Sequence, residues 1–183
     1  MATFVDKVLA STGAAKVDVV GHSQGGMMPN YYIKRLGGAS KVRTFIGLSP
    51  SNHGTSLSNI VTLGADLNLL GFTNALIWGA GIPGLAQQEV GSPFQKALFA
   101  DGDTVAGPRY VVIQTKYDHI VTPYRTAFLN GATNILIQDQ CPNDAVGHVG
   151  MFLDSPVLQN VMNQLGANAP AFKATCSGYG PVL

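Results

Sequence analysis

The sequence predicts one α/β domain, spanning residues 1–183, in which a mostly parallel sheet is flanked by helices. Short apolar runs alternate along the chain with segments whose apolar residues recur at helical spacing. Strands that alternate with helices in this way are typical of a parallel sheet. A chain of 183 residues suits a single domain and can bury about 70% of its unfolded surface, so a substantial core is expected.

The elements follow from local patterns, taken in order along the chain. A first helix is expected to end near Gly13, because the residues before it have helical spacing and glycine commonly ends a helix. Apolar runs predict four strands, and apolar spacing with terminal glycines predicts two further helices. The strands are expected at 17–20, 42–48, 110–115 and 134–138, and the helices at 27–36 and 157–165.

The composition excludes several classes of protein. Charged residues make up only 11% of the chain against a usual value of about 25%, and hydrophobic residues make up 46%. Disorder is therefore excluded, and a weakly charged, partly apolar surface is expected. The net charge is +1 and the basic residues are scattered, so the sequence does not predict the basic patch of a nucleic-acid-binding protein. The most apolar stretch, 69–86, is interrupted by polar residues and Pro83, so no membrane span is predicted.

The most informative motif is Gly-x-Ser-x-Gly at 21–25, directly after the first predicted strand and before a predicted helix. Strand, Gly-x-Ser-x-Gly and helix together form the nucleophile elbow of α/β-hydrolases. The flanking Gly21 and Gly25 are expected to let strand and helix approach without a Cβ clash. The helix N-terminus favours negative charge near Ser23. Ser23 is therefore the predicted nucleophile; the alternative is a solvated serine in a glycine-rich loop.

A serine nucleophile needs a base and an orienting acid, and in α/β-hydrolases the chain order is serine, acid, histidine. His148 lies in the loop between the last strand and the last helix and is the predicted base; the alternative is a surface loop histidine. The other histidines fit less well. His22 is inside the elbow and expected to point away from the serine, His53 precedes any acid and is assigned to loop shaping, and His119 is expected to point elsewhere.

Asp118 is the predicted acid because it directly follows the strand at 110–115, which places it at the same sheet edge as Ser23. Asp144 is its main rival, since it lies only a few residues before His148. The remaining candidates are weaker: Asp139, which follows the last strand, and Asp101 and Asp103, which are expected in a solvated turn.

These assignments give each of the predicted residues a role. His148 takes the Ser23 proton, Asp118 orients the imidazole, and the main-chain N–H of Gln24 is one oxyanion-hole donor. No residues have the spacing of metal ligands, so no metal site is expected. The apolar span 56–107 carries no clear strand and is expected to form a cap or acyl pocket, although ordinary helices packed on the sheet are the alternative.

Cys141 and Cys176 are the two cysteines of the chain. In a chain so low in charge they are expected to form the one disulfide of a secreted protein, worth about 3–4 kcal/mol in the chain-entropy model. Two buried free thiols are the alternative. Residues 1–7 do not have the pattern of a signal peptide.

Four segments together resemble the secreted, actinomycete-type class 2 lipases: VDVVGHSQGG, FIGLSPSNHGT, TKYDHIVTP and CPNDAVGHVGM. A weaker likeness extends to fungal lipases with a Ser-Gln-Gly-Gly elbow. The resemblance implies an extracellular α/β-hydrolase that cleaves carboxylic esters, including triacylglycerols, without a cofactor. Its substrate is then a small-molecule or lipid ester, with transient contact to a lipid interface.

The chain departs from this pattern before Ser23, where family members carry a much longer segment with the first strands and a His-Gly oxyanion loop. The strand at 17–20 is therefore expected to be a sheet edge, in an N-terminally truncated chain with no assigned second oxyanion donor. The sequence leaves two other functions open. One is another serine acyl hydrolase or acyltransferase, such as a short-chain esterase or a polyester depolymerase, because one triad serves them all. The other is an inactive fragment that only binds.

Overall fold

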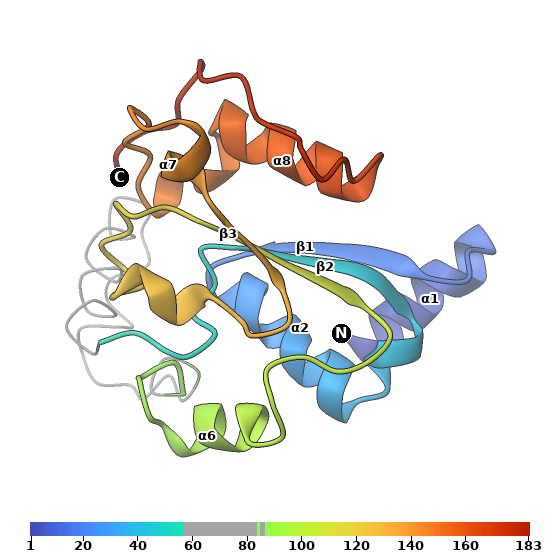
Figure 1. Ribbon diagram of the computed structural model, residues 1–183. Coiled ribbons are helices and arrows are strands. Elements are labelled where there is room, and N and C mark those ends of the chain that lie inside the picture. Colours follow the sequence, from blue (N-terminus) through green and yellow to red (C-terminus); the bar gives the residue numbers. More distant parts are fainter. Residues whose placement is uncertain (57–83, 85–86) are drawn as a thin grey trace, which may run out of the picture.

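The computed structural model describes residues 1–56, 84 and 87–183, and it shows the predicted parallel sheet (Figure 1). The four strands described pair in sequence order, β1-β2-β3-β4, and every pairing is parallel. Their bounds are β1 (Val17–His22), β2 (Val42–Leu48), β3 (Arg109–Gln114) and β4 (Thr133–Leu136). Because all four strands run in the same direction, their carboxyl ends and the loops that follow them meet at one edge of the sheet.

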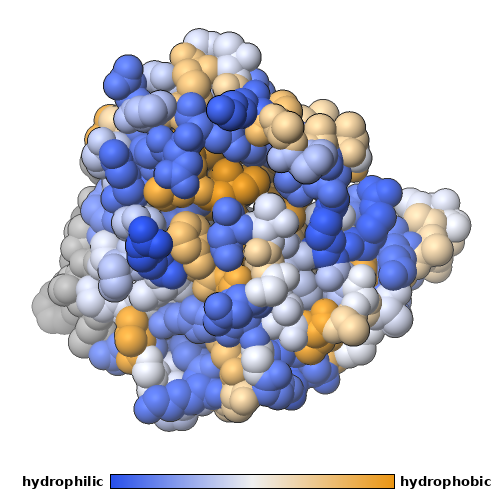
Figure 2. All heavy atoms as spheres, viewed as in Figure 1, coloured by the Kyte–Doolittle hydropathy of each residue, from blue (hydrophilic) through white to orange (hydrophobic). Residues whose placement is uncertain are grey.

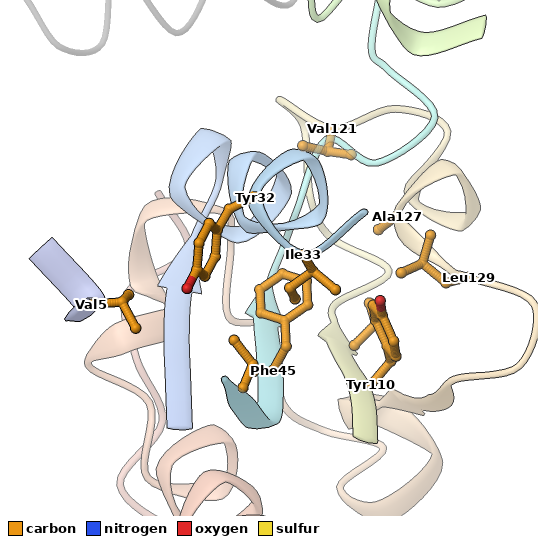
Figure 3. Packing of buried hydrophobic residues seen from close by; sticks show 10 residues of the cluster. Val5, Tyr32, Ile33, Phe45, Tyr110, Val121, Ala127 and Leu129 are labelled. Atoms are coloured by element: carbon orange, nitrogen blue, oxygen red, sulfur yellow. The ribbon is translucent and has the colours of Figure 1, made fainter. Parts of the chain in front are cut away.

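Two helices from the first part of the chain cover one face of the sheet. They are α1 (Ala2–Thr12), which ends at Gly13 as expected, and α2 (Gln24–Arg35). Figure 3 shows the core that they form: Tyr32 and Ile33 of α2 lie over Phe45 and Tyr110 of the central strands. Tyr110 and Val112 of β3 point into this cluster and Val111 points to the other face, as the period of two along a strand requires.

The opposite face is covered by α8 (Ser155–Leu165) and by the short helix α7 (Ile137–Gln140) (Figure 1). The remaining alternate residues of β2 and β3 pack here against Val157 and Val161 of α8. The Asp154 carboxylate caps α8 by accepting a hydrogen bond from the Val157 N–H at 2.8 Å. This cap explains why α8 begins at Ser155, two residues before the expected start.

Other element boundaries also differ from the expectations. The apolar run at 134–138 does not stay extended, because the strand ends at Leu136 and α7 follows at once. Asp139 therefore lies within a helix and not in a strand-end loop. Most of the span 56–107, expected to be a cap, lies outside the described residues. Its described part contains α6 (Pro93–Phe99), capped by the Ser92 hydroxyl, which accepts from the Gln95 N–H.

The surface is partly apolar, as the low charge predicts. Figure 2 shows apolar residues in a hollow near the centre of the face that Figure 1 presents. β1 has one partner strand among the four described, and Val20 on this strand is 44% exposed. Among the described residues, no helix combines the length and apolarity needed to cross a membrane.

Cys141 and Cys176 form the expected disulfide, with their Cα atoms 5.3 Å apart. Cys141 directly follows α7, and Cys176 lies beyond α8, so the bond closes a loop that contains both His148 and the last helix. The chain-entropy model assigns about 3–4 kcal/mol to a loop of this length.

We expect reduction of the disulfide to lower the free energy of unfolding by about this amount, because the unfolded chain regains the entropy of the open loop. Urea unfolding with and without a reductant measures the effect, and a Cys141→Ser, Cys176→Ser variant should match the reduced protein. Equal unfolding midpoints for the oxidised and reduced proteins would contradict the prediction.

Candidate active site

Ser23 lies in the sharp turn between β1 and α2, in the backbone conformation expected of a nucleophile elbow. Its φ of 55° and ψ of −125° are rare for a residue other than glycine. Its main-chain N–H donates to the Leu48 carbonyl at 2.9 Å, which ties the turn to the end of β2. Strained backbone of this kind persists only where the surrounding structure holds it in place.

Close main-chain packing holds the turn. A Cβ on Gly21 would lie 2.0 Å from the Gly25 carbonyl oxygen. That carbonyl has no donor four residues on in α2, since Pro29 lacks an N–H. A Cβ on Gly26 would lie 2.9 Å from the Gly21 oxygen and 3.3 Å from the Gly47 Cα. The expectation for Gly25 itself is wrong, because its Cβ would meet open space; Gly26 is the residue that allows the close approach.

The structure brings the predicted acid and base together. His148 Nδ1 lies 2.9 Å from Asp118 Oδ2, and both side chains are buried. The other carboxylate oxygen accepts the N–H groups of Ile120 at 2.9 Å and Val121 at 2.8 Å. Because a carboxylate can only accept here, Nδ1 of His148 carries the proton. Nε2 of His148 is buried and has no hydrogen-bond partner among the described residues.

The surroundings keep Asp118 ionised. Burial alone would raise the pKa of its carboxyl. The hydrogen bond and charge of His148, with the N–H groups of Val121 and Ile120, outweigh burial and hold the pKa below its usual value. Stability from this group is therefore present above the ordinary carboxyl pKa and is lost as the pH falls below it.

His22 makes a contact that the sequence did not reveal. Its Nε2 lies 2.9 Å from the His148 carbonyl oxygen, and the centroids of the two imidazole rings are 4.7 Å apart. Burial, followed by the charge of His148, lowers the pKa of His22 to about 4, so the ring is neutral at neutral pH. Since a carbonyl only accepts, Nε2 carries the single ring proton. His22 thus links the end of β1 to the main chain of His148.

The rival candidates lie elsewhere. Asp144 is fully buried, but its Oδ1 accepts the Val146 N–H at 2.9 Å and its neighbour is Asp154. Asp101 is exposed and pairs with Lys34 and Arg35. His119 is exposed.

The expectation of a solvated turn at Asp103 is wrong. This carboxylate is 9% exposed and accepts from the N–H and the side-chain amide of Asn130, at 2.7 and 2.9 Å. His53 also approaches it, at 3.4 Å, and donates its main-chain N–H to Thr126. His53 therefore holds loops together, in agreement with the loop-shaping role assigned to it.

Gln24 is the first residue of α2, so the helix's own hydrogen-bond ladder leaves its N–H unused. Its side chain lines a groove of about 290 Å³ that runs along α2 toward α6. The rest of the described lining is mostly apolar: Met27, Met28, Tyr31, Gly84, Gln87 and Phe94. Within the described residues, no group of three or more His, Cys, Asp or Glu side chains is placed to hold a metal ion.

A family model described as "Lipase (class 2)" matches residues 1–160. The chain belongs to the class 2 lipase family. Solved structures share the fold of this family member. Lipase B of Aspergillus fumigatus matches with a TM-score of 0.67 and 22% identity, over 100% of this chain and 44% of that one. The mature lipase BlEst2 of Bacillus licheniformis matches with a TM-score of 0.52 and 18% identity, over 74% of this chain and 62% of that one.

An α/β hydrolase from a sediment metagenome of the Mar Chica lagoon, Morocco, also matches, with a TM-score of 0.53 and 16% identity. It covers 91% of this chain and 68% of that one. The α/β-hydrolase fold predicted from the sequence is therefore shown. The chain spans less than half the length of the Aspergillus lipase and under two thirds of the Bacillus lipase.

In this class 2 lipase family member, the buried pair of Asp144 and Asp154 predicts a pH effect on stability. Burial, with the neighbouring charge of Asp154, raises the pKa of Asp144 to about 6, against about 3.9 in an unfolded chain. Between these values the folded protein holds a proton that the unfolded chain releases. The free energy of unfolding therefore falls as the pH rises from about 4 to 6.

Asp144→Asn removes this titration and keeps a side chain of nearly the same size. We expect the variant to gain stability relative to the parent protein on going from pH 4.5 to pH 8, measured by urea unfolding at both values. Asp101→Asn, at an exposed aspartate, is the control. A stability difference between variant and parent that is the same at both pH values would contradict the assignment.

Proposed function

We propose that the chain is a serine carboxylic-ester hydrolase, a lipase that cleaves acylglycerols through Ser23, His148 and Asp118. The observation that carries this proposal is the buried His148, whose Nδ1 is held by Asp118 while Nε2 has no hydrogen-bond partner in the part of the chain that the structure describes. Ser23 is held in the strained elbow at the same edge of the sheet. Membership of the class 2 lipase family supports the same chemistry.

The proposed reaction has two halves. Nε2 of His148 takes the Ser23 hydroxyl proton as Oγ attacks the ester carbonyl, and a tetrahedral intermediate forms. The carbon–oxygen bond to the alcohol then breaks, Nε2–H protonates the leaving alcohol, and the acyl group remains on Oγ. In the second half, water gives its proton to Nε2 and attacks the acyl-enzyme, which releases the acid and returns the proton to Oγ.

Two other groups have defined parts in this scheme. The Asp118 carboxylate keeps the Nδ1 proton in place, so Nε2 presents its lone pair to Ser23, and it stabilises the imidazolium that forms. The N–H of Gln24, which the α2 ladder leaves unused, donates to the developing oxyanion. One such donor contributes about 3–4 kcal/mol to the transition state in comparable enzymes.

The site is suited to an apolar substrate. The groove that begins at Gln24 presents methionine and aromatic side chains, and such surfaces bind hydrocarbon by removing it from water. The low charge and the exposed apolar residues favour transient contact with a lipid interface. The disulfide fits an oxidising compartment, which supports an extracellular location.

Fluorophosphonate labelling read by mass spectrometry tests the nucleophile. We expect the label on Ser23 alone and its loss in Ser23→Ala, since only a serine with its base in place attacks such a probe quickly. Asp118→Asn should lower kcat by about 10⁴-fold, as in a serine protease whose orienting acid becomes an amide. Ser40→Ala, at a serine outside the site, is the control. A folded protein that takes no label would refute the proposed activity.

Ester chain length tests the substrate class. Hydrolysis of p-nitrophenyl esters should favour octanoate and longer chains over acetate in kcat/KM, because each buried methylene contributes up to about 0.8 kcal/mol. A preference for acetate would indicate a short-chain esterase instead of a lipase.

A further inference from the structure

We propose that residues 180–183, named here the tail segment, hold His148 in its catalytic position through main-chain hydrogen bonds. This inference rests on the proposed role of His148 as the base. His148 lies in an irregular loop and precedes the short 3₁₀ helix η4 (Val149–Phe152), so no strand or long helix fixes it. A base must be held within a fraction of an ångström of its working position, and some other part of the chain has to supply that rigidity.

The tail segment binds the peptide groups on both sides of the histidine. The Gly147 N–H donates to the Pro181 carbonyl at 3.0 Å, and the Val149 N–H donates to the main-chain oxygen of Leu183 at 2.7 Å. The Gly150 N–H also lies 3.3 Å from that oxygen. His148 is therefore bracketed by two hydrogen bonds to the same short segment.

Glycines allow this contact. A Cβ on Gly147 would lie 2.4 Å from the Val182 carbonyl oxygen, and a Cβ on Gly150 would lie 2.2 Å from the Pro181 oxygen. A Cβ on Gly180 would lie 2.6 Å from the Gly150 oxygen. Each distance is too short for a side chain, so main chain packs directly on main chain.

The side chains of the tail segment do not make this contact. Pro181, Val182 and Leu183 are all exposed, and the last two are each 65% exposed. Since exposed side chains gain little from burial, the hydrogen bonds and the close main-chain packing carry the interaction.

The tail segment is itself anchored to the body of the protein. The Gly180 N–H donates to the second oxygen of Asp154 at 2.8 Å, while the first oxygen caps α8. The Gly178 carbonyl accepts the Ser155 N–H at 3.0 Å, and the disulfide fixes Cys176 beside α7. Figure 1 shows this end of the chain close to α7. These contacts fix the position of the tail segment where it begins.

The other side of the loop is held independently. The His148 carbonyl faces His22, and the Val146 carbonyl accepts the Thr115 hydroxyl at 2.8 Å. Loss of the tail segment should therefore loosen the histidine loop on one side without unfolding the sheet. The tail segment contacts the main chain on either side of His148 and not the substrate groove. Its loss should therefore lower kcat while KM changes little.

The test is deletion of residues 181–183, with deletion of Leu183 alone as a milder variant that removes only the acceptor of Val149 and Gly150. Restoring the deleted residues as Pro-Ala-Ala supplies the main chain without the two large side chains. Tyr179→Phe is the matched control, because it removes a side-chain hydrogen bond to the Cys176 carbonyl just before the tail segment. Circular dichroism and thermal unfolding identify a temperature at which all variants are folded.

Two readouts do not depend on turnover. Hydrogen–deuterium exchange of the peptide around 145–152 should accelerate in the deletions and return to the parent rate with Pro-Ala-Ala. The ring N–H resonance of His148, which reports the hydrogen bond to Asp118, should broaden or shift in the deletions. In the same variants we expect kcat to fall by about 10²-fold, the loss typical of a catalytic group displaced by about 1 Å.

The outcomes separate the two proposals. The proposed role of the tail segment would be refuted if the 181–183 deletion left the exchange rate and the His148 resonance unchanged. It would also be refuted if the Pro-Ala-Ala variant did not return both to the parent values. If exchange and the His148 resonance change as expected but the protein shows no Ser23-dependent turnover, the role of the tail segment stands and the proposed activity is refuted.

Discussion

The buried carboxylate of Asp118 is the constraint on which the site depends. A charge removed from water costs several kcal/mol unless hydrogen bonds and opposite charge replace the lost hydration. The loop after β3 turns so that two of its own N–H groups reach one oxygen, and His148 supplies the donor for the other. Satisfying Asp118 therefore fixes the imidazole, its tautomer and the direction of Nε2 at the same time.

Rigidity elsewhere in the site comes from main chain packed against main chain. At the elbow, Gly21, Gly26 and Gly47 bring β1, α2 and β2 closer than side chains would allow. At the histidine loop, Gly147 and Gly150 do the same against the tail segment. The elbow and the histidine loop are therefore held in the same way: glycine has no Cβ, so main chains pack closely, and hydrogen bonds fix them there. Groups held in this way need little reorganisation when charge develops in a transition state.

Features with a local signature in the sequence were predictable. Gly-x-Ser-x-Gly predicted the elbow, strand-end placement favoured Asp118 over Asp144, and chain order favoured His148. The side chains of Asp118 and His148 lie 2.9 Å apart, and their catalytic roles stay predictions. The sequence did not reveal contacts made by carbonyl and N–H groups, which every residue carries. The link from His22 to the His148 carbonyl and the tail segment are of this kind. Asp103 was misjudged because its partner, Asn130, is distant in the sequence. The glycines at 147, 150 and 180 were the available signal for the tail segment.

The order of the strands has a consequence for how such a domain can vary. Each of the four described strands pairs with the next in sequence, and β2 and β3 are neighbours although residues 49–108 separate them along the chain. The entropy of closing a loop grows only with the logarithm of its length, by about 0.6 kcal/mol for each doubling. The Thr55 N–H donates to the Gln88 carbonyl at 2.9 Å, so the number of residues that join these two positions can change at little entropic cost while the elbow and the histidine loop keep their geometry.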